Sequence, residues 1–258
     1  LGGLSAVGCG LLLTWFLASF SFPLNYSLAF FAAFALQIFS IIVQTNLIEE
    51  HPSPVVERKP FFVYLRQLPR VLQENVPFRN FVYATIVQII ATMPVGFYTV
   101  YALRKFSADE SIVGKFTLAI VAVQVVSSLG IGFLTDKWGN KITLVIAAVA
   151  LFLANVWAMF APSLEWFALV YIFLGINLGT ELLARYNISI EYGPSEQRAT
   201  YVGLMNTVIA PFYFVGVIGG ALINVFDYGT VFWIGTFFSI LGILLMVFKV
   251  REPRKLLG

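Results

Sequence analysis

Long stretches without a charged residue constrain this sequence more than any other feature. Residues 1–48 contain no Asp, Glu, Lys or Arg, and a break at 21–25, which includes Pro23, divides them into two halves. Further uncharged runs cover 80–103, 116–135, 142–164, 166–180, 199–226 and 228–248. A helix of about 20 apolar residues crosses a bilayer, and only helices and closed barrels satisfy their backbone there. No barrel-like alternation is present, so the sequence predicts an all-α polytopic membrane protein with eight transmembrane helices.

The composition excludes most other classes of protein. Hydrophobic residues make up 59% of the chain and charged residues only 11%, far from the averages of soluble domains. The net charge of +3 does not indicate a nucleic-acid partner, because the basic residues lie beside the apolar runs rather than along one helical face. With one cysteine, Cys9, and one histidine, His51, we predict no metal site and no cofactor. The chain begins with Leu1 inside an apolar run, and we expect it to be a fragment.

The positions of lysine and arginine predict the orientation, because these residues accumulate in cytoplasmic loops. If 49–79 is cytoplasmic, the same side receives most of the 16 basic residues. They are Arg58, Lys59, Arg66, Arg70, Arg79, Lys137, Lys141, Arg198, Lys249, Arg251, Arg254 and Lys255. The expected location is a bacterial inner membrane, with both ends of the chain in the cytoplasm.

The longest polar stretch, 49–79, reads as a linker followed by an amphipathic helix. Its apolar face carries Phe61, Leu65, Leu68 and Leu72, and Arg66, Arg70 and Gln73 lie opposite. Such a helix is expected to rest on the bilayer surface with its arginines near lipid phosphates. A helix that binds a partner protein is the alternative.

Two short motifs lie in loops on the predicted cytoplasmic side. The first, residues 132–141, is predicted to form a charged hairpin between two uncharged runs and reads Gly132-x-Leu134-x-Asp136-Lys137-x-Gly139-x-Lys141. The second follows the 166–190 run and reads Glu191-x-x-Pro194-x-x-x-Arg198. Glycines permit a tight turn between helices, and an aspartate suits a helix N-terminus.

Both motifs resemble those of the major facilitator superfamily of transporters. The resemblance implies two helices that end a first half (1–48), a central cytoplasmic linker (49–79), a complete six-helix second half (80–250) and a cytoplasmic tail (251–258). It also implies a charge network that closes the cytoplasmic gate. Carried over by position, that network comprises Gly132, Asp136, Lys137, Gly139, Lys141, Glu191 and Arg198, with Asp136, Glu191 and Arg198 together. The alternative is that these are ordinary solvated loop charges.

Glu181 is the most informative single residue. At about 1.5 Å per residue it lies about 15 Å inside the membrane from Glu191, where an unpaired carboxylate is costly. Asn177 and Arg185 are spaced four residues to either side on the same face. This polar stripe is expected to line a substrate or proton pathway, or else to be a structural ion pair between helices. Gln88 and Gln124 are further pathway candidates, with interhelical hydrogen bonding as the alternative.

These observations favour a secondary transporter that moves a small solute by alternating access, coupled to protons through Glu181 or uncoupled. It is expected to act as a monomer. A membrane enzyme is disfavoured, because no His-Glu-x-x-His motif or Ser/His constellation is present. A non-transporting relative that binds a lipid, a pigment or a partner subunit is the second alternative.

Overall fold

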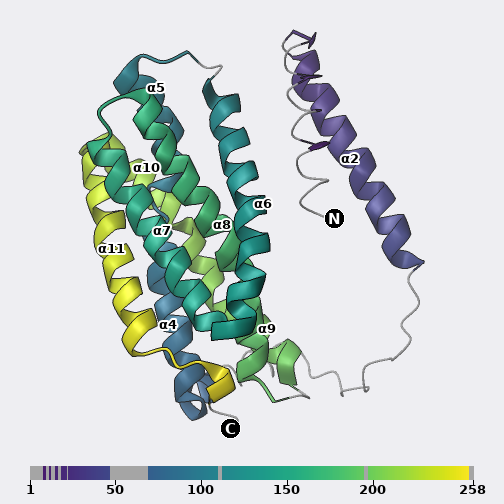
Figure 1. Ribbon diagram of the computed structural model, residues 1–258, viewed down its shortest axis with the longest axis vertical. Coiled ribbons are helices and arrows are strands. Elements are labelled where there is room, and N and C mark those ends of the chain that lie inside the picture. The colour runs from purple at the N-terminus through teal and green to yellow at the C-terminus, as the bar shows by residue number, and fades with distance from the viewer. Residues whose placement is uncertain are drawn as a thin grey trace. The chain divides into compact units, whose positions relative to one another are not determined.

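The structure, a computed structural model, describes residues 8–9, 12, 15–16, 19–21, 23–46, 69–109, 112–194 and 197–255 (Figure 1). Within these residues every regular element is a helix, as the uncharged runs predict. The chain divides into two compact units, Leu1–Arg66 and Gln67–Gly258. The described residues contain seven segments long and apolar enough to cross a membrane. The eighth predicted span falls in the first half of 1–48, most of which lies outside the described residues.

The first unit contains helix α2 (Leu24–Thr45), which begins directly after Pro23. Its large apolar side chains are exposed, with Phe30 at 74% and Phe31 at 70%. In a membrane such side chains face lipid or neighbouring helices rather than water. The second span predicted within 1–48 thus corresponds to a helix long and apolar enough to cross a membrane.

The second unit is a bundle that holds the other six candidate spans. They are α4 with α5 (Val76–Phe106), α6 (Ile112–Trp138), α7 (Asn140–Phe160), α8 (Leu164–Tyr192), α9 to α10 (Arg198–Val225) and α11 (Tyr228–Phe248). Helix α7 packs against both α8 and α11, while α6 packs on α8 and α4 packs on α11 (Figure 1).

Helix α4 (Val76–Ala91) begins four residues before the predicted start at 80. Asn75 is its N-cap, and its side-chain oxygen accepts a hydrogen bond from the backbone N–H of Phe78 at 3.0 Å. This cap and Pro77 in the first turn start the helix upstream of Arg79. The predicted span began only at residue 80, because Arg79 is charged. Asp227 caps α11 in the same way, and the backbone N–H of Thr230 holds the pKa of Asp227 below its usual range.

The turn between α6 and α7 is shorter than the charged hairpin predicted over 132–141. Helix α6 continues through Asp136 to Trp138, and Gly139 alone separates it from α7. Gly139 has a φ of 86°, a left-handed conformation that glycine adopts without strain. A β-carbon there would also overlap with the carboxylate of Glu252. Gly132, in contrast, has open space where its β-carbon would be, so it is not a site of close approach within the described chain.

Two spans are interrupted at prolines. The first passes from α4 through the short 3₁₀ turn η1 (Val95–Phe97) into α5 (Tyr98–Phe106) directly after Pro94. The second passes from α9 (Arg198–Ile209) through η3 (Ala210–Phe214), which contains Pro211, into α10 (Val215–Val225). Proline removes a backbone donor and disturbs the helical hydrogen bonds of the preceding turn.

A buried asparagine compensates for the first break. The backbone N–H of Val95 bonds to Thr92 rather than to Ala91. The amide nitrogen of Asn155 on α7 donates to the Ala91 carbonyl at 3.2 Å and to the Ser239 hydroxyl at 3.0 Å. Its oxygen accepts from the Tyr98 hydroxyl at 2.5 Å. This Asn155 junction therefore joins α4, α5, α7 and α11 at the break.

Aromatic side chains fill the end of the bundle that holds α5. Phe116 stacks on Tyr171 with ring centroids 4.0 Å apart, and Phe167 and Phe232 are fully buried beside them. These residues come from the first turns of α6, α8 and α11 or close to them. The aromatic cluster therefore packs α5, α6, α8 and α11 together at this end of the second unit.

The amphipathic helix predicted within 49–79 lies largely outside the described residues. Residues 69–74 are helical, and Arg70 forms an exposed ion pair with Glu74 at 2.7 Å. Its placement at a membrane surface stays a prediction.

Candidate functional site

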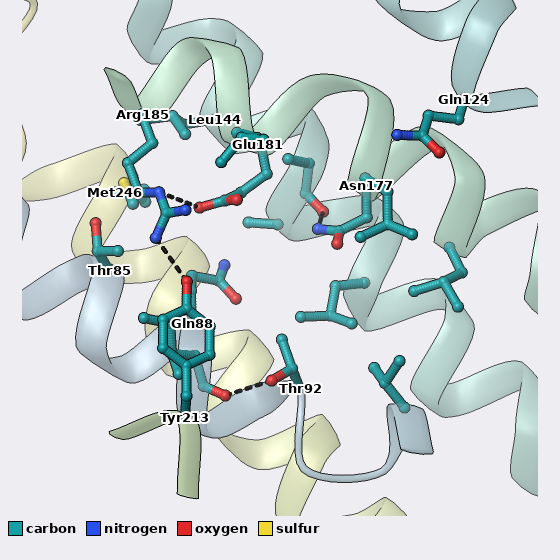
Figure 2. A pocket seen from close by; sticks show the side chains of 18 residues that line it. Thr85, Gln88, Thr92, Gln124, Leu144, Asn177, Glu181, Arg185, Tyr213 and Met246 are labelled. Carbon is teal, nitrogen blue, oxygen red and sulfur yellow. Dashed lines mark hydrogen bonds and ion pairs between the residues drawn. The ribbon is translucent and has the colours of Figure 1, made fainter. Parts of the chain in front are cut away.

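A cavity of about 400 Å³ opens between the helices of the second unit. Helices α4, α6, α7, α8 and α11 and the η3 turn contribute to its wall (Figure 2). Its polar lining consists of Thr85, Gln88, Thr92, Gln124, Asn177, Glu181, Arg185 and Tyr213. The remaining lining is apolar. All five residues that the sequence analysis assigned to a substrate or proton pathway thus lie around one space, although their role stays a prediction.

The charges of this cavity form one ion pair. Arg185 Nε lies 3.2 Å from Glu181 Oε1, one turn away on α8. The Arg185 side chain is 8% exposed, whereas Glu181 is 29% exposed. The side chain of Glu181 is therefore the more exposed of the two.

Tyr213 is a cavity residue that the sequence analysis did not single out. Its hydroxyl accepts a hydrogen bond from Arg185 Nη1 at 2.8 Å (Figure 2). Tyr213 lies in η3, two residues after Pro211, so the interruption of this span carries it to the arginine. The break at Pro211 was the available signal, but it does not reveal which neighbouring side chain turns inward.

The amide side chains of the cavity differ in their partners. Asn177 donates to the backbone carbonyl of Ala147 at 2.9 Å and so links α8 to α7. Gln124 is exposed on α6. Gln88 is only 9% exposed, and neither its amide nitrogen nor its amide oxygen has a hydrogen-bond partner among the described residues. Figure 2 shows Gln88 from α4 and the ion pair from α8 facing the same space.

The predicted gate residues lie at the opposite end of the bundle from the aromatic cluster, but their partners differ from those expected. Glu191 Oε1 accepts hydrogen bonds from Arg254 Nε and from Asn140 Nδ2, each at 3.1 Å. Arg254 also donates to the Thr135 carbonyl at 3.2 Å. Arg198, the expected partner, is exposed and forms no ion pair with any side chain that the structure describes.

Asp136 is likewise outside this cluster. It is exposed near the end of α6 and forms no ion pair with the described side chains. The expected grouping of Asp136, Glu191 and Arg198 is therefore corrected to Glu191, Asn140 and Arg254. Lys137 is also exposed, and its ammonium lies 5.5 Å from the ring centre of Trp138.

The C-terminal segment supplies the rest of the network. Glu252 accepts a hydrogen bond from the backbone N–H of Lys141 at 2.8 Å, in the first turn of α7. A carboxylate there is favoured by the positive end of the helix dipole. The Lys141 ammonium donates to the Val247 carbonyl at 2.7 Å. Sequence reasoning missed Glu252 and Arg254, because their partners lie more than sixty positions away in the chain.

A comparison with known protein families matches the part of the chain that forms the second unit. A family model described as Major Facilitator Superfamily matches residues 81–257, more than half of the sequence. The matched region contains the cavity and the network around Glu191. No curated protein sequence matches the chain.

Proposed function

Because the chain belongs to the major facilitator superfamily, a family of transporters rather than enzymes, we propose that it moves a small solute across a membrane by alternating access. The observation that carries this proposal is the cavity between α4 and α8. It gathers the Glu181–Arg185 pair and the unpartnered amide of Gln88 inside membrane-spanning helices. Polar groups at this depth are costly, and they mark solute and ion pathways in membrane proteins.

Proton coupling through Glu181 is the mechanism that the geometry supports best. Glu181 is the accessible partner of an ion pair whose arginine is nearly buried. When Glu181 binds a proton, Arg185 loses its counter-charge but keeps its hydrogen bond to Tyr213. A proton on Glu181 therefore changes the charge inside the cavity, as coupling requires. A purely structural ion pair is the competing role.

The network around Glu191 is proposed to stabilise one state of the transport cycle. It ties the ends of α6, α7 and α8 to the C-terminal segment through Arg254 and Glu252. The excess of Lys and Arg on this side of the bundle supports a cytoplasmic location for the network. Opening the bundle there requires these contacts to rearrange, so their strength sets part of the balance between states.

The test is solute-driven proton movement in vesicles. The complete protein is purified and reconstituted with a pH-sensitive dye inside, and a library of small solutes is added outside under a clamped membrane potential. At least one solute is expected to change the interior pH faster than in protein-free vesicles, because proton-coupled transport moves protons together with the solute or in exchange for it. Radiolabelled exchange of the hit separates coupled from uncoupled transport. If no solute moves protons or exchanges above the protein-free control, the protein is a non-transporting member of the family.

A further inference from the structure

The amide of Gln88 stands apart from the other polar groups around the cavity. Thr85 and Thr92 donate to carbonyls of their own helix, at 3.0 and 2.7 Å. Asn177 is bonded to α7 and Arg185 to Glu181 and Tyr213. Gln88 alone among the described lining residues has both polar atoms buried without a partner. Buried polar atoms are nearly always paired in proteins, so both atoms of this amide need a partner, which a water or a solute in the adjoining cavity can supply.

Packing from α11 fixes where this amide lies. A β-carbon on Gly242 would come within 2.8 Å of the Gln88 amide carbon, which shows that α11 contacts the side chain closely. The amide therefore occupies room that only glycine leaves at this position. A side chain held in this way is ready to bind before the ligand arrives, which reduces the entropy lost on binding.

The chemistry of the amide restricts what it binds. It presents an acceptor and a donor on neighbouring atoms, and a group with the opposite pair satisfies both at once. Amides and lactams have such a pair. A carboxylate has only acceptors and leaves the oxygen of Gln88 unpaired, whereas an ammonium has only donors and leaves the nitrogen unpaired. A hydroxyl has a single atom and does not bridge both positions.

The charge and shape of the cavity restrict the rest of the ligand. Its two charged residues neutralise each other across 3.2 Å, so a charged solute adds a charge without a partner. Most of the other lining side chains are aliphatic, among them Ile89, Leu151 and Leu178. These surfaces suit a compact apolar body.

We infer that the solute is a small uncharged molecule with an amide or lactam group on an apolar body, and that Gln88 forms hydrogen bonds to this group. This inference rests on the proposed transport function. Glu181 and Arg185 then serve coupling rather than recognition of a charged group. This division of roles leaves the ion pair free to change its protonation while the amide holds the solute.

Four probes that share one ring and differ in one substituent test the inference. Nicotinamide, nicotinate, 3-(hydroxymethyl)pyridine and 3-(aminomethyl)pyridine carry an amide, an anion, a hydroxyl and a cation, respectively. Binding to the complete protein in lipid nanodiscs is measured by calorimetry. Nicotinamide is expected to bind in the millimolar range or better, and about tenfold more tightly than the other three, because it makes one more hydrogen bond to Gln88 than each of them.

Substitutions at Gln88 provide a second test, in which nicotinamide binding is compared between variants and the parent protein. Gln88→Met keeps the volume but removes both polar atoms, and is expected to weaken nicotinamide binding about tenfold. Thermal unfolding of this variant is expected at the parent temperature or above, since two unpaired buried atoms are lost. Gln88→Glu is expected to shift the preference toward the amine. Gln73→Met, which removes an exposed amide outside the spans, is the matched control with parent affinities.

The inference is overturned if nicotinate or the amine binds the parent protein more tightly than nicotinamide does. Unchanged nicotinamide affinity in Gln88→Met overturns it as well, as does the absence of any nicotinamide binding. These outcomes are separable from the fate of the proposed function. Amide binding without vesicle transport removes only the transport proposal, whereas transport of charged solutes alone removes only the amide inference.

Discussion

Glu181→Gln is expected to abolish uphill solute accumulation while solute exchange continues. The substituted amide keeps the size and the hydrogen-bonding oxygen of the carboxylate but does not bind and release a proton. Because Glu181 contributes the accessible charge of the pair with Arg185, its loss disconnects the proton gradient from the solute. Accumulation in vesicles with an imposed proton gradient is expected to fall to the equilibrium level.

A double variant distinguishes loss of the proton carrier from simple charge imbalance. Glu181→Gln leaves Arg185 with an uncompensated charge, which by itself perturbs the cavity. Glu181→Gln combined with Arg185→Gln removes both charges. If the defect reflects the missing proton carrier, the double variant also lacks accumulation. Restored accumulation in the double variant, or normal accumulation in the single one, returns the pair to a structural role.

Asn155→Leu is expected to lower the free energy of unfolding by about 2–4 kcal/mol, because it leaves the Tyr98 hydroxyl and the Ala91 carbonyl buried and unpaired. Leucine is similar in size but offers no hydrogen bond to any of these groups. The break after Pro94 depends on this side chain, since the Ala91 carbonyl has lost its helical partner. Reversible unfolding of the complete protein in mixed micelles measures the change.

Asn206→Leu is the matched control for this prediction. Asn206 is exposed on α9, so the same substitution there removes no buried hydrogen bond. Its free energy of unfolding is expected to stay within about 0.5 kcal/mol of the parent. Equal stability of the two variants would mean that the Asn155 junction contributes nothing to the fold.

Much of the fold was predictable, because bilayer thickness dictates the length of uncharged runs. The spans from α4 to α11 and the breaks near Pro94 and Pro211 follow from that rule and from the chemistry of proline. The start of α4 was misplaced, since the Asn75 cap outweighs the charge of Arg79. The hairpin over 132–141 was predicted too long, because the left-handed conformation of Gly139 allows a one-residue turn.

The side-chain contacts of the candidate site were predictable only within single helices. Asn177, Glu181 and Arg185 share one face of α8 through their spacing, and that spacing is visible in the sequence. The partners that other helices contribute were not visible in the sequence, because tertiary packing determines which of several charged residues reaches a given side chain. Arg254 rather than Arg198 reaches Glu191, and Tyr213 reaches Arg185. Both pairs join residues with no regular spacing between them.

Accessibility of the cavity from the two sides of the membrane tests the central claim most directly and requires no known solute. Leu178 lines the cavity on α8, whereas Leu183 on the same helix is similarly exposed but does not line it. Each is replaced by cysteine in a complete protein freed of native cysteines, and impermeant thiol reagents are applied from either side. Alternating access predicts that the Leu178→Cys protein reacts from both sides, and that conditions which raise its reactivity on one side lower it on the other. Reaction of Leu178→Cys from one side only, or a pattern identical to that of Leu183→Cys, would contradict transport through this cavity.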